Sequence, residues 1–118
     1  MTDHLTVTTR PITGGTVLEF AGRLDAVTSP GALRTIGGLA LHRGQRLVLD
    51  LTRLDFCDSS GISVLITARS TALAAEAALA LVAVPRGLRG MLARTGLDAV
   101  FPIYPTLARL EESWVPRP

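Results

Sequence analysis

The sequence contains no lysine and a single cysteine, and each shortage excludes a class of protein. All 12 basic residues are arginine, so a phosphate-binding loop of the Gly-x-x-x-x-Gly-Lys type is absent. Because Cys57 has no second cysteine to pair with, an internal disulfide is excluded and a reducing compartment is indicated. The only histidines, His4 and His42, accompany no recognisable nucleophile or metal-ligand motif.

Long apolar runs and strong charge clusters are also missing. The most apolar segment, residues 77–84, is too short to span a bilayer and directly follows Glu76. Residues 1–6 lack the basic region and apolar core of a signal peptide. Non-specific nucleic-acid binding requires a basic patch, and the only candidate residues are Arg86, Arg89 and Arg94. We therefore expect a cytoplasmic protein that binds neither a membrane nor nucleic acid.

The apolar residues that are present predict one α/β domain over residues 1–118, with an irregular tail from about residue 113. A length of 118 residues supports one core, and 47% of the residues are hydrophobic. Short apolar or alternating runs predict strands at residues 4–9, 16–21, 47–51, 79–84 and 100–103. Apolar residues at helical spacing and start signals predict helices at residues 28–42, 60–73 and 86–94, and from Pro105 onward.

The order of these elements predicts a mixed, mostly parallel sheet of about five strands with about four helices. The turn residues of segment 11–15 join the first two strands in an antiparallel hairpin. Helical connections between the later strands imply right-handed crossovers and parallel pairing. Helical spacing predicts the following buried positions: Leu33, Ile36 and Ala40; Ile62, Leu65, Ile66 and Leu73; Leu107 and Leu110. Trp114 is expected to cover the rim of the core.

The segment Phe56-Cys57-Asp58-Ser59-Ser60-Gly61 connects a predicted buried strand to a predicted helix. Asp and Ser oxygens can accept hydrogen bonds from the unpaired N–H groups of a helix start, and we expect the Ser60 hydroxyl to make such a local bond. Loops that leave the carboxyl ends of parallel strands meet at one edge of a sheet. Segments 22–29, 52–60 and 85–86 are such loops, which predicts that Asp25, Asp58 and Ser59 share one rim.

The residues on this rim do not predict an enzyme. Ser59 is not flanked by the two glycines of a Gly-x-Ser-x-Gly nucleophile elbow, and both histidines are expected far from it. Asp25 and Asp58 could face a cation, but two carboxylates are too few for a convincing site. We therefore expect no catalytic residue, metal or cofactor, and interpret the rim as a binding surface.

Three segments resemble the STAS domain family, the sulfate-transporter and anti-sigma-factor-antagonist family. Leu47–Leu65, reading LVLDLTRLDFCDSSGISVL, resembles the core of that family. Phe20–Asp25, reading FAGRLD, resembles its Gly-x-Leu-Asp element, and Met91–Leu97, reading MLARTGL, resembles its late helix and turn. The resemblance covers nearly the whole chain and implies a STAS-like fold. In the bacterial antagonist subgroup the first serine of the Asp-Ser-Ser-Gly box is phosphorylated, which corresponds to Ser59 here.

The resemblance implies an anti-sigma factor antagonist that works by partner switching. The unphosphorylated form would bind an anti-sigma factor serine kinase and release a sigma factor, the kinase would phosphorylate the serine, and a serine phosphatase would restore the unphosphorylated form. The residues expected at the partner surface are Asp25, Asp58, Ser59, Ser60 and Gly61. Phosphate adds about −1.5 to −2 charges. A helix N-terminus tolerates that charge, whereas a partner docked over it would lose contact.

Three alternatives stay open at the level of the sequence. The domain could be a STAS scaffold or sensor subunit of a larger signalling or lipid-transport complex, without a phosphoswitch. It could instead sense a small ligand, which would require an apolar cavity. Cys57 could act as a redox switch beside the serines, although a cysteine in this position is more often a small buried hydrophobe.

Overall fold

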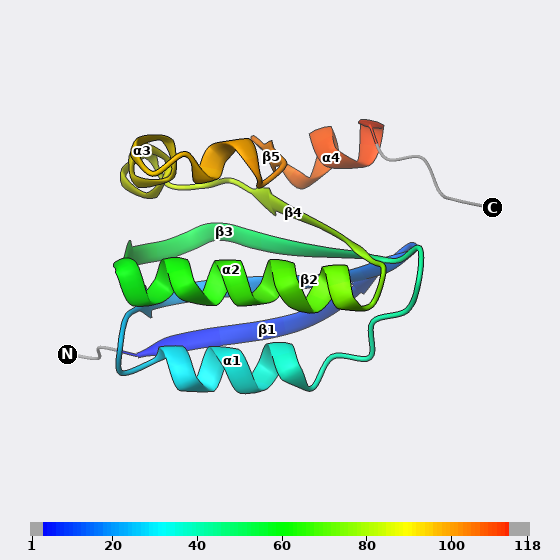
Figure 1. Ribbon diagram of the computed structural model, residues 1–118, viewed down its shortest axis with the longest axis horizontal. Helices are drawn as coiled ribbons and strands as arrows, with labels where there is room; N and C mark the ends of the chain where they lie inside the picture. Colours follow the sequence, from blue (N-terminus) through cyan, green and yellow to red (C-terminus); the bar gives the residue numbers. More distant parts are fainter. Residues whose placement is uncertain (1–3, 114–118) are drawn as a thin grey trace.

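A five-stranded sheet with four α-helices accounts for most of residues 4–113, the part of the chain that this computed structural model describes (Figure 1). The strands are β1 (Leu5–Ile12), β2 (Gly15–Leu24), β3 (Arg46–Cys57), β4 (Ala78–Val82) and β5 (Ile103–Tyr104). The helices are α1 (Ser29–Gly37), α2 (Ser59–Ala74), α3 (Arg86–Arg94), the short 3-10 turn η1 (Leu97–Ala99) and α4 (Leu107–Ser113). The expectations for Trp114 and the irregular tail fall mostly outside the described residues.

The strands lie side by side in chain order, from β1 to β5. β1 and β2 are antiparallel, and Gly14 takes a positive φ of 75° in the two-residue turn between Ile12 and Gly15. Each later strand is parallel to its neighbour because a helical crossover separates the two. The predicted α/β class, the hairpin and the parallel pairing are therefore confirmed.

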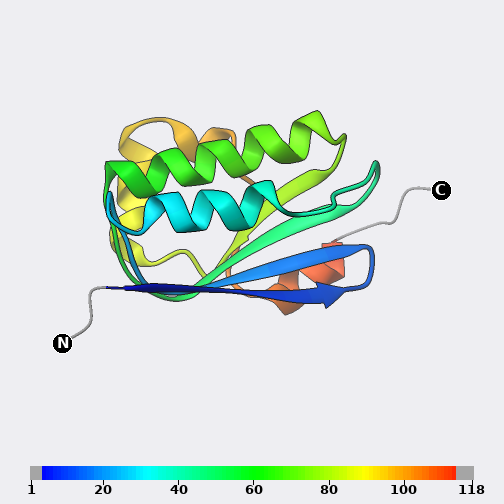
Figure 2. The same ribbon diagram turned by 90° about the horizontal axis from the view of Figure 1, so that it is seen from below.

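Helices cover both faces of the sheet, as Figure 2 shows, with α1 and α2 on one side and α4 on the other. Successive side chains of a strand point to opposite faces. Leu47, Leu49 and Leu51 of β3 accordingly join the main core with residues of α1, α2 and α3, whereas Val48 joins a smaller cluster that includes Leu110 of α4. Leu107 packs against that smaller cluster, so both predicted inward positions of the last helix are confirmed.

β2 and β3 run farther than the sequence predicted, because two bulges keep them paired. Register shifts occur between Glu19 and Ala21 and between Gly22 and Arg23. They allow the polar segment 52–57 to continue as strand, where the end of the apolar run had predicted a loop. Segment 22–24 is likewise strand rather than loop. The last residues of both strands therefore lie at the same edge of the sheet.

The first helix is shorter than predicted and buries different residues. α1 ends at Gly37 rather than near His42, and Leu33 (38% exposed) and Ala40 face solvent. Ile36 is buried as predicted, together with Ser29 and Ala32. The chain leaves the helix early because residues 38–45 form a loop in which Leu39 and Leu41 pack against the core. A Cβ at Gly37 would meet no atom within 4 Å, so packing on the sheet does not require this glycine.

The buried face of α2 is also shifted from the predicted one. Ile62 and Leu65 are buried as expected, but Ile66 and Leu73 are 42% and 55% exposed. The other buried side chains are small or β-branched: Val64, Ala68 and Ala72. α2 contacts α1, β3 and β4, and alanines allow the close approach that so many neighbours require. The last strand begins at Ile103 rather than at Val100, which follows η1 and is 41% exposed.

Candidate functional site

The first turn of α2 is capped by Asp58. Its backbone is extended (φ −106°, ψ −165°), and its Oδ1 accepts hydrogen bonds from the N–H groups of Ser60 (2.9 Å) and Gly61 (3.3 Å). The Ser60 hydroxyl makes no hydrogen bond with any described residue, contrary to the expectation for it. The physical reason is that the Asp58 carboxylate already occupies the N–H groups that a serine cap would use.

Ser59 is the first residue of α2, and its side chain is exposed. Its carbonyl accepts a hydrogen bond from the Ser63 hydroxyl (3.2 Å), one turn later in the helix. The unpaired N–H groups of a helix start carry a partial positive charge that favours an anion. The position therefore combines access for another protein with a local field that tolerates a phosphate.

Asp25 organises the loop between β2 and α1. Its Oδ1 accepts hydrogen bonds from the N–H groups of Val27 (3.0 Å) and Thr28 (3.1 Å), and its Oδ2 lies 3.6 Å from Nε of Arg23. The Thr28 N–H is the main cause that lowers the pKa of this carboxyl, followed by the Val27 N–H, the Thr28 hydroxyl and Arg23. Thr28 makes no side-chain cap for α1, because its hydroxyl oxygen accepts from the Asp25 N–H (3.0 Å) and its hydroxyl donates to the Arg23 carbonyl (2.7 Å).

The two acidic loops lie next to each other at the left end of the molecule in Figure 1. Leu24 and Cys57 are partners across β2 and β3, and the Asp58 N–H donates to the Leu24 carbonyl (3.3 Å). Gly61 makes this approach possible, since a Cβ there would lie 2.9 Å from the Leu24 oxygen and would overlap the Cys57 sulfur. The predicted common rim for Asp25, Asp58 and Ser59 therefore exists, whereas Gly61 is buried beneath it.

Cys57 is half-buried against the main core rather than presented on the rim. Burial, and secondarily the charge of Asp58, raises the pKa of the thiol to about 11. A reactive cysteine requires the opposite shift, because the thiolate is the nucleophile. The redox alternative is therefore disfavoured, and Cys57 acts as a small apolar residue.

Two exposed apolar residues flank the acidic loops and were missed at the level of the sequence. Val27 is 82% exposed, and Phe56 is 38% exposed with the Arg23 guanidinium 4.0 Å from its ring centroid. In a regular strand the side chains of Leu54 and Phe56 would face the same side, so the buried Leu54 predicts that Phe56 also faces the core. The bulge between Gly22 and Arg23 shifts the register, so that Cys57 packs inward and Phe56 faces outward. No signal in the sequence marks that bulge.

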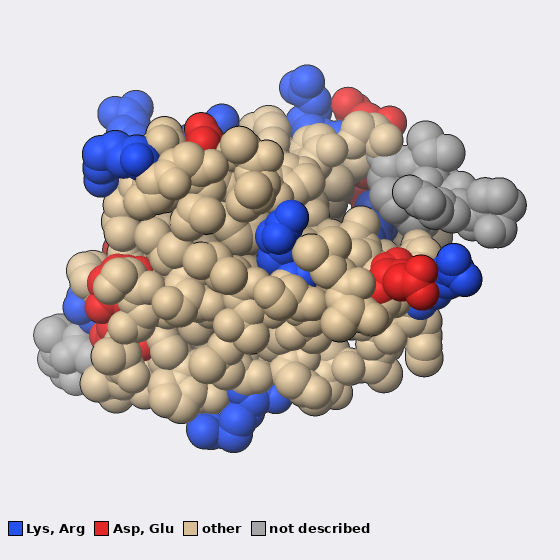
Figure 3. Space-filling model, viewed as in Figure 1, with Lys and Arg blue, Asp and Glu red and all other residues tan. Residues whose placement is uncertain are grey.

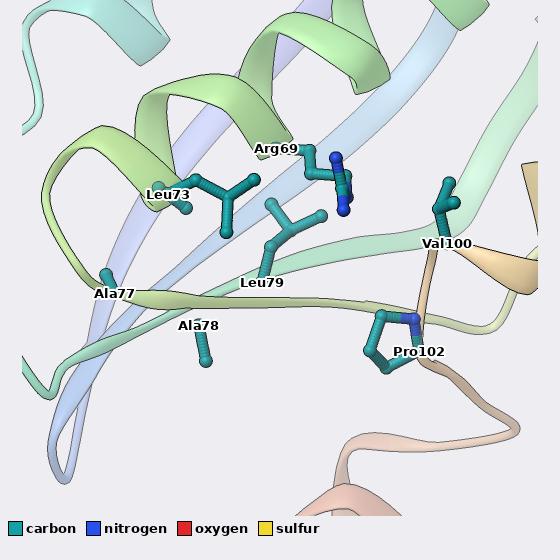
Figure 4. A pocket seen from close by; sticks show the side chains of 8 residues that line it. Arg69, Leu73, Ala77, Ala78, Leu79, Val100 and Pro102 are labelled. Atoms are coloured by element: carbon teal, nitrogen blue, oxygen red, sulfur yellow. The ribbon is translucent and has the colours of Figure 1, made fainter.

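Three shallow hollows lie among the described residues, and all are open to solvent. One of about 300 Å³ lies between the end of β3 and α3, and one of about 170 Å³ lies beside Leu110 of α4. A third, of about 240 Å³, is lined by Arg69, Leu73 and Val100 at the far end of α2 (Figure 4). Small-molecule sites usually occupy about 300–1,000 Å³ and enclose the ligand. Only one of these three hollows reaches the lower end of that range, and none of the three encloses a ligand, so they give no support to the small-ligand sensor.

No three or more His, Cys, Asp or Glu side chains among residues 4–113 are grouped so that they could hold a metal ion. Among the described helices, none has the length and apolar character needed to cross a membrane.

Comparison with known proteins agrees with the fold. Anti-sigma-F factor antagonist RsfB of Mycobacterium tuberculosis is 30% identical over 105 residues, which cover 89% of this chain and 85% of that protein. The crystal structure of an anti-sigma factor antagonist from Mycobacterium paratuberculosis matches with a TM-score of 0.80 and 31% identity over 91% of each chain. Phosphorylated SpoIIAA of Bacillus matches with a TM-score of 0.68 and 18% identity over 91% of this chain and 97% of that one, which supports the shared fold alone.

The family assignment agrees with these relatives. The family model described as the STAS domain matches residues 5–110, which include the whole sheet, α1 to α3 and the first half of α4. The features described above, an Asp-capped serine at the start of α2 and a second acidic loop beside it, lie within this match. The chain belongs to the STAS domain family.

Proposed function

We propose that this protein is an anti-sigma factor antagonist whose unphosphorylated form captures an anti-sigma factor serine kinase and thereby releases a sigma factor. Two mycobacterial relatives that bear the name anti-sigma factor antagonist support this proposal, at 30% and 31% identity over most of their length. The observation that carries it is the exposed Ser59 at the start of α2, beside the loop of Asp25. The protein acts as a binding partner in this proposal and not as an enzyme.

The proposed switch depends on the negative charge that phosphorylation adds to the rim. Phosphorylation of Ser59 would add about −1.5 to −2 charges directly beside Asp58. The helix start accommodates that charge, so the fold persists while the surface changes. A partner docked there meets added bulk, added desolvation cost and repulsion of its own acidic groups. A serine phosphatase that removes the phosphate restores the binding surface.

The proposed partner surface consists of the polar and apolar groups around Ser59. Asp25, Asp58 and Ser60 surround the serine, and each is only partly buried. Val27 and Phe56 add exposed apolar area, which is the kind of group that supplies much of the affinity of an interface. Gly61 contributes indirectly, because it allows α2 to start close to the end of β2.

The decisive experiment measures the affinity of four forms for each purified anti-sigma factor of the source genome. Wild type and Ser59→Ala should bind one of these factors, and only wild type should accept phosphate from it. Ser59→Asp carries one charge where phosphate carries nearly two, so its affinity should fall by about tenfold, or about 1.4 kcal/mol. The phosphorylated protein should bind more weakly still. Calorimetry gives the affinities, and circular dichroism should show an unchanged fold.

Ser63→Ala provides the matched control, because Ser63 is exposed one turn later on the same helix. This variant should be phosphorylated and should bind as wild type does. Equal affinities for all four forms would refute the switch and leave the alternative of a STAS scaffold subunit with a fixed contact. Phosphate located on Ser60 or Ser63 by peptide mapping would refute the assignment of Ser59.

A further inference from the structure

We propose that α3 is the basic part of the same docking surface, and that it binds an acidic segment of the anti-sigma partner with one apolar side chain in the adjoining hollow. This inference rests on the proposed function and specifies the chemistry of the partner. Three observations carry it: the arginines of α3 that pair with no described residue, the hollow between α3 and β3, and two glycines that the described part of the fold does not need.

The exposed side of α3 carries Arg86, Arg89 and Arg94, whereas Leu88 and Leu92 bury the other side. None of these arginines forms an ion pair with a described residue, although the exposed Arg43 and Arg109 both do. The three span about 12 Å along the helix axis, at 1.5 Å per residue. Their guanidinium groups can therefore pair with carboxylates of another protein without first breaking an internal contact.

Helix stability explains Arg94, which lies in the last turn of α3, but not Arg86 and Arg89. The first turn contains no acidic residue, and Arg86 lies at its start, where the helix dipole favours the opposite charge. Arg89 follows one turn later on the same exposed side. Basic residues at an N-terminus weaken a helix, so intermolecular contact provides a better reason for them than folding does.

The glycines of α3 point to close approach by a partner. Glycine weakens a helix interior relative to alanine. A Cβ at Gly87 would meet no atom within 4 Å, so neither the core nor a turn requires a glycine at this position. A Cβ at Gly90 would contact only the Arg94 side chain, at 3.3 Å. Both positions leave the backbone of the basic face open to a neighbouring chain.

The hollow of about 300 Å³ lies between α3 and the end of β3, the strand that leads into the loop of Ser59. Its lining includes Leu54, Phe56 and Cys57 of β3 together with Gly87 and Met91 of α3. Cys57 is the last residue of β3 and α2 begins at Ser59, so an occupant of the hollow would lie at the end of the molecule that carries the serine. The apolar lining and the volume suit a single leucine, isoleucine or phenylalanine side chain of a bound protein.

The charge pattern of this end of the molecule favours a protein partner over nucleic acid. Figure 3 shows basic side chains gathered over α3 and acidic side chains at the same end of the molecule. Asp55 and Arg94 both line the hollow, where the two regions meet. A DNA or RNA backbone would be repelled by the acidic region. A protein surface can place its carboxylates opposite α3 and keep them away from Asp25 and Asp58, which a uniformly charged phosphate backbone cannot do.

The test compares two double variants for affinity to the purified anti-sigma factor that binds wild type. Arg86→Glu with Arg89→Glu should reduce the affinity at least tenfold, because an acidic segment would then face like charge. The control, Arg43→Glu with Arg109→Glu, changes the net charge by the same amount as the first double variant. Its two positions lie away from the rim, in the loop before β3 and on α4. This control should bind nearly as wild type does. New glutamates at the start of α3 suit the helix dipole, so the fold should persist.

A second variant tests the hollow without changing charge. Gly87→Leu should fill part of it and reduce the affinity at least tenfold, while the thermal midpoint stays equal or rises because leucine favours a helix. Unchanged affinity in both the Arg86/Arg89 double variant and Gly87→Leu would overturn this inference alone. Failure of wild type to bind any anti-sigma factor would overturn the proposed function as well. Tight binding of a DNA duplex that is lost in the Arg86/Arg89 double variant would also refute an acidic protein segment.

Discussion

At the scale of single residues, the carboxylate of Asp58 stabilises the start of α2 and the serine hydroxyls do not. Asp58→Ala removes both accepted N–H bonds and should lower the free energy of unfolding by about 0.5–2 kcal/mol. Ser60→Ala should change it by less than about 0.5 kcal/mol, since no described residue bonds its hydroxyl. Urea unfolding of both variants distinguishes them. A larger loss for Ser60→Ala than for Asp58→Ala would contradict this assignment of the cap.

Cys57 provides a prediction of pH dependence. Its pKa is raised from 9.0 to about 11, so the folded state favours the neutral thiol. The stability that this provides is complete below about pH 9 and is lost as the pH rises toward 11. At pH 7.5, alkylation of the folded protein by iodoacetamide should be much slower than alkylation of the urea-unfolded chain. Equal rates would refute the raised pKa.

At the scale of the elements, Gly61 determines how closely α2 approaches β2. Gly61→Ala would place a methyl group against the Leu24 carbonyl and the Cys57 sulfur, which should destabilise the protein by about 1–3 kcal/mol. Gly37→Ala is the matched control at the end of α1, where the new methyl group meets nothing within 4 Å. That control should not destabilise the protein. Thermal unfolding of the two variants tests the difference, and equal midpoints would argue against the close approach.

At the scale of the whole molecule, Arg46 connects the hairpin turn to the last helix. Its side chain is 3% exposed, donates to the Thr13 carbonyl from Nε (3.2 Å) and Nη2 (2.8 Å), and pairs with Glu111 of α4. Arg46→Ala should cost about 1–3 kcal/mol, because the Thr13 carbonyl loses its partner. Arg109→Ala, which removes an exposed pair with Glu112, should cost at most about 1 kcal/mol. Equal urea midpoints for the two variants would contradict a linking role for Arg46.

The sequence by itself determined the class of the fold and the edge of the sheet at which the candidate site lies. Short apolar runs separated by helical spacing indicate parallel strands with crossovers, and such strands place their following loops at one edge. Asp25, Asp58 and Ser59 could be assigned to that edge because each lies in a loop that follows a predicted strand. A helix cap forms between residues only two or three positions apart, so the sequence could predict that Asp or Ser would cap α2. The structure shows that Asp58 and not Ser60 supplies the cap.

Only the tertiary structure decided what each side chain of the rim contacts. The bulges, whose extra residues lie in β3, depend on pairing with β2, and they turn Phe56 outward and Cys57 inward. Exposure of Ile66 and Leu73 depends on which neighbours α2 meets, and helical spacing alone cannot specify those neighbours. Packing and register arise between segments far apart in the chain, whereas periodicity and capping act within a few residues. The sequence therefore locates the site, and long-range contacts determine its surface.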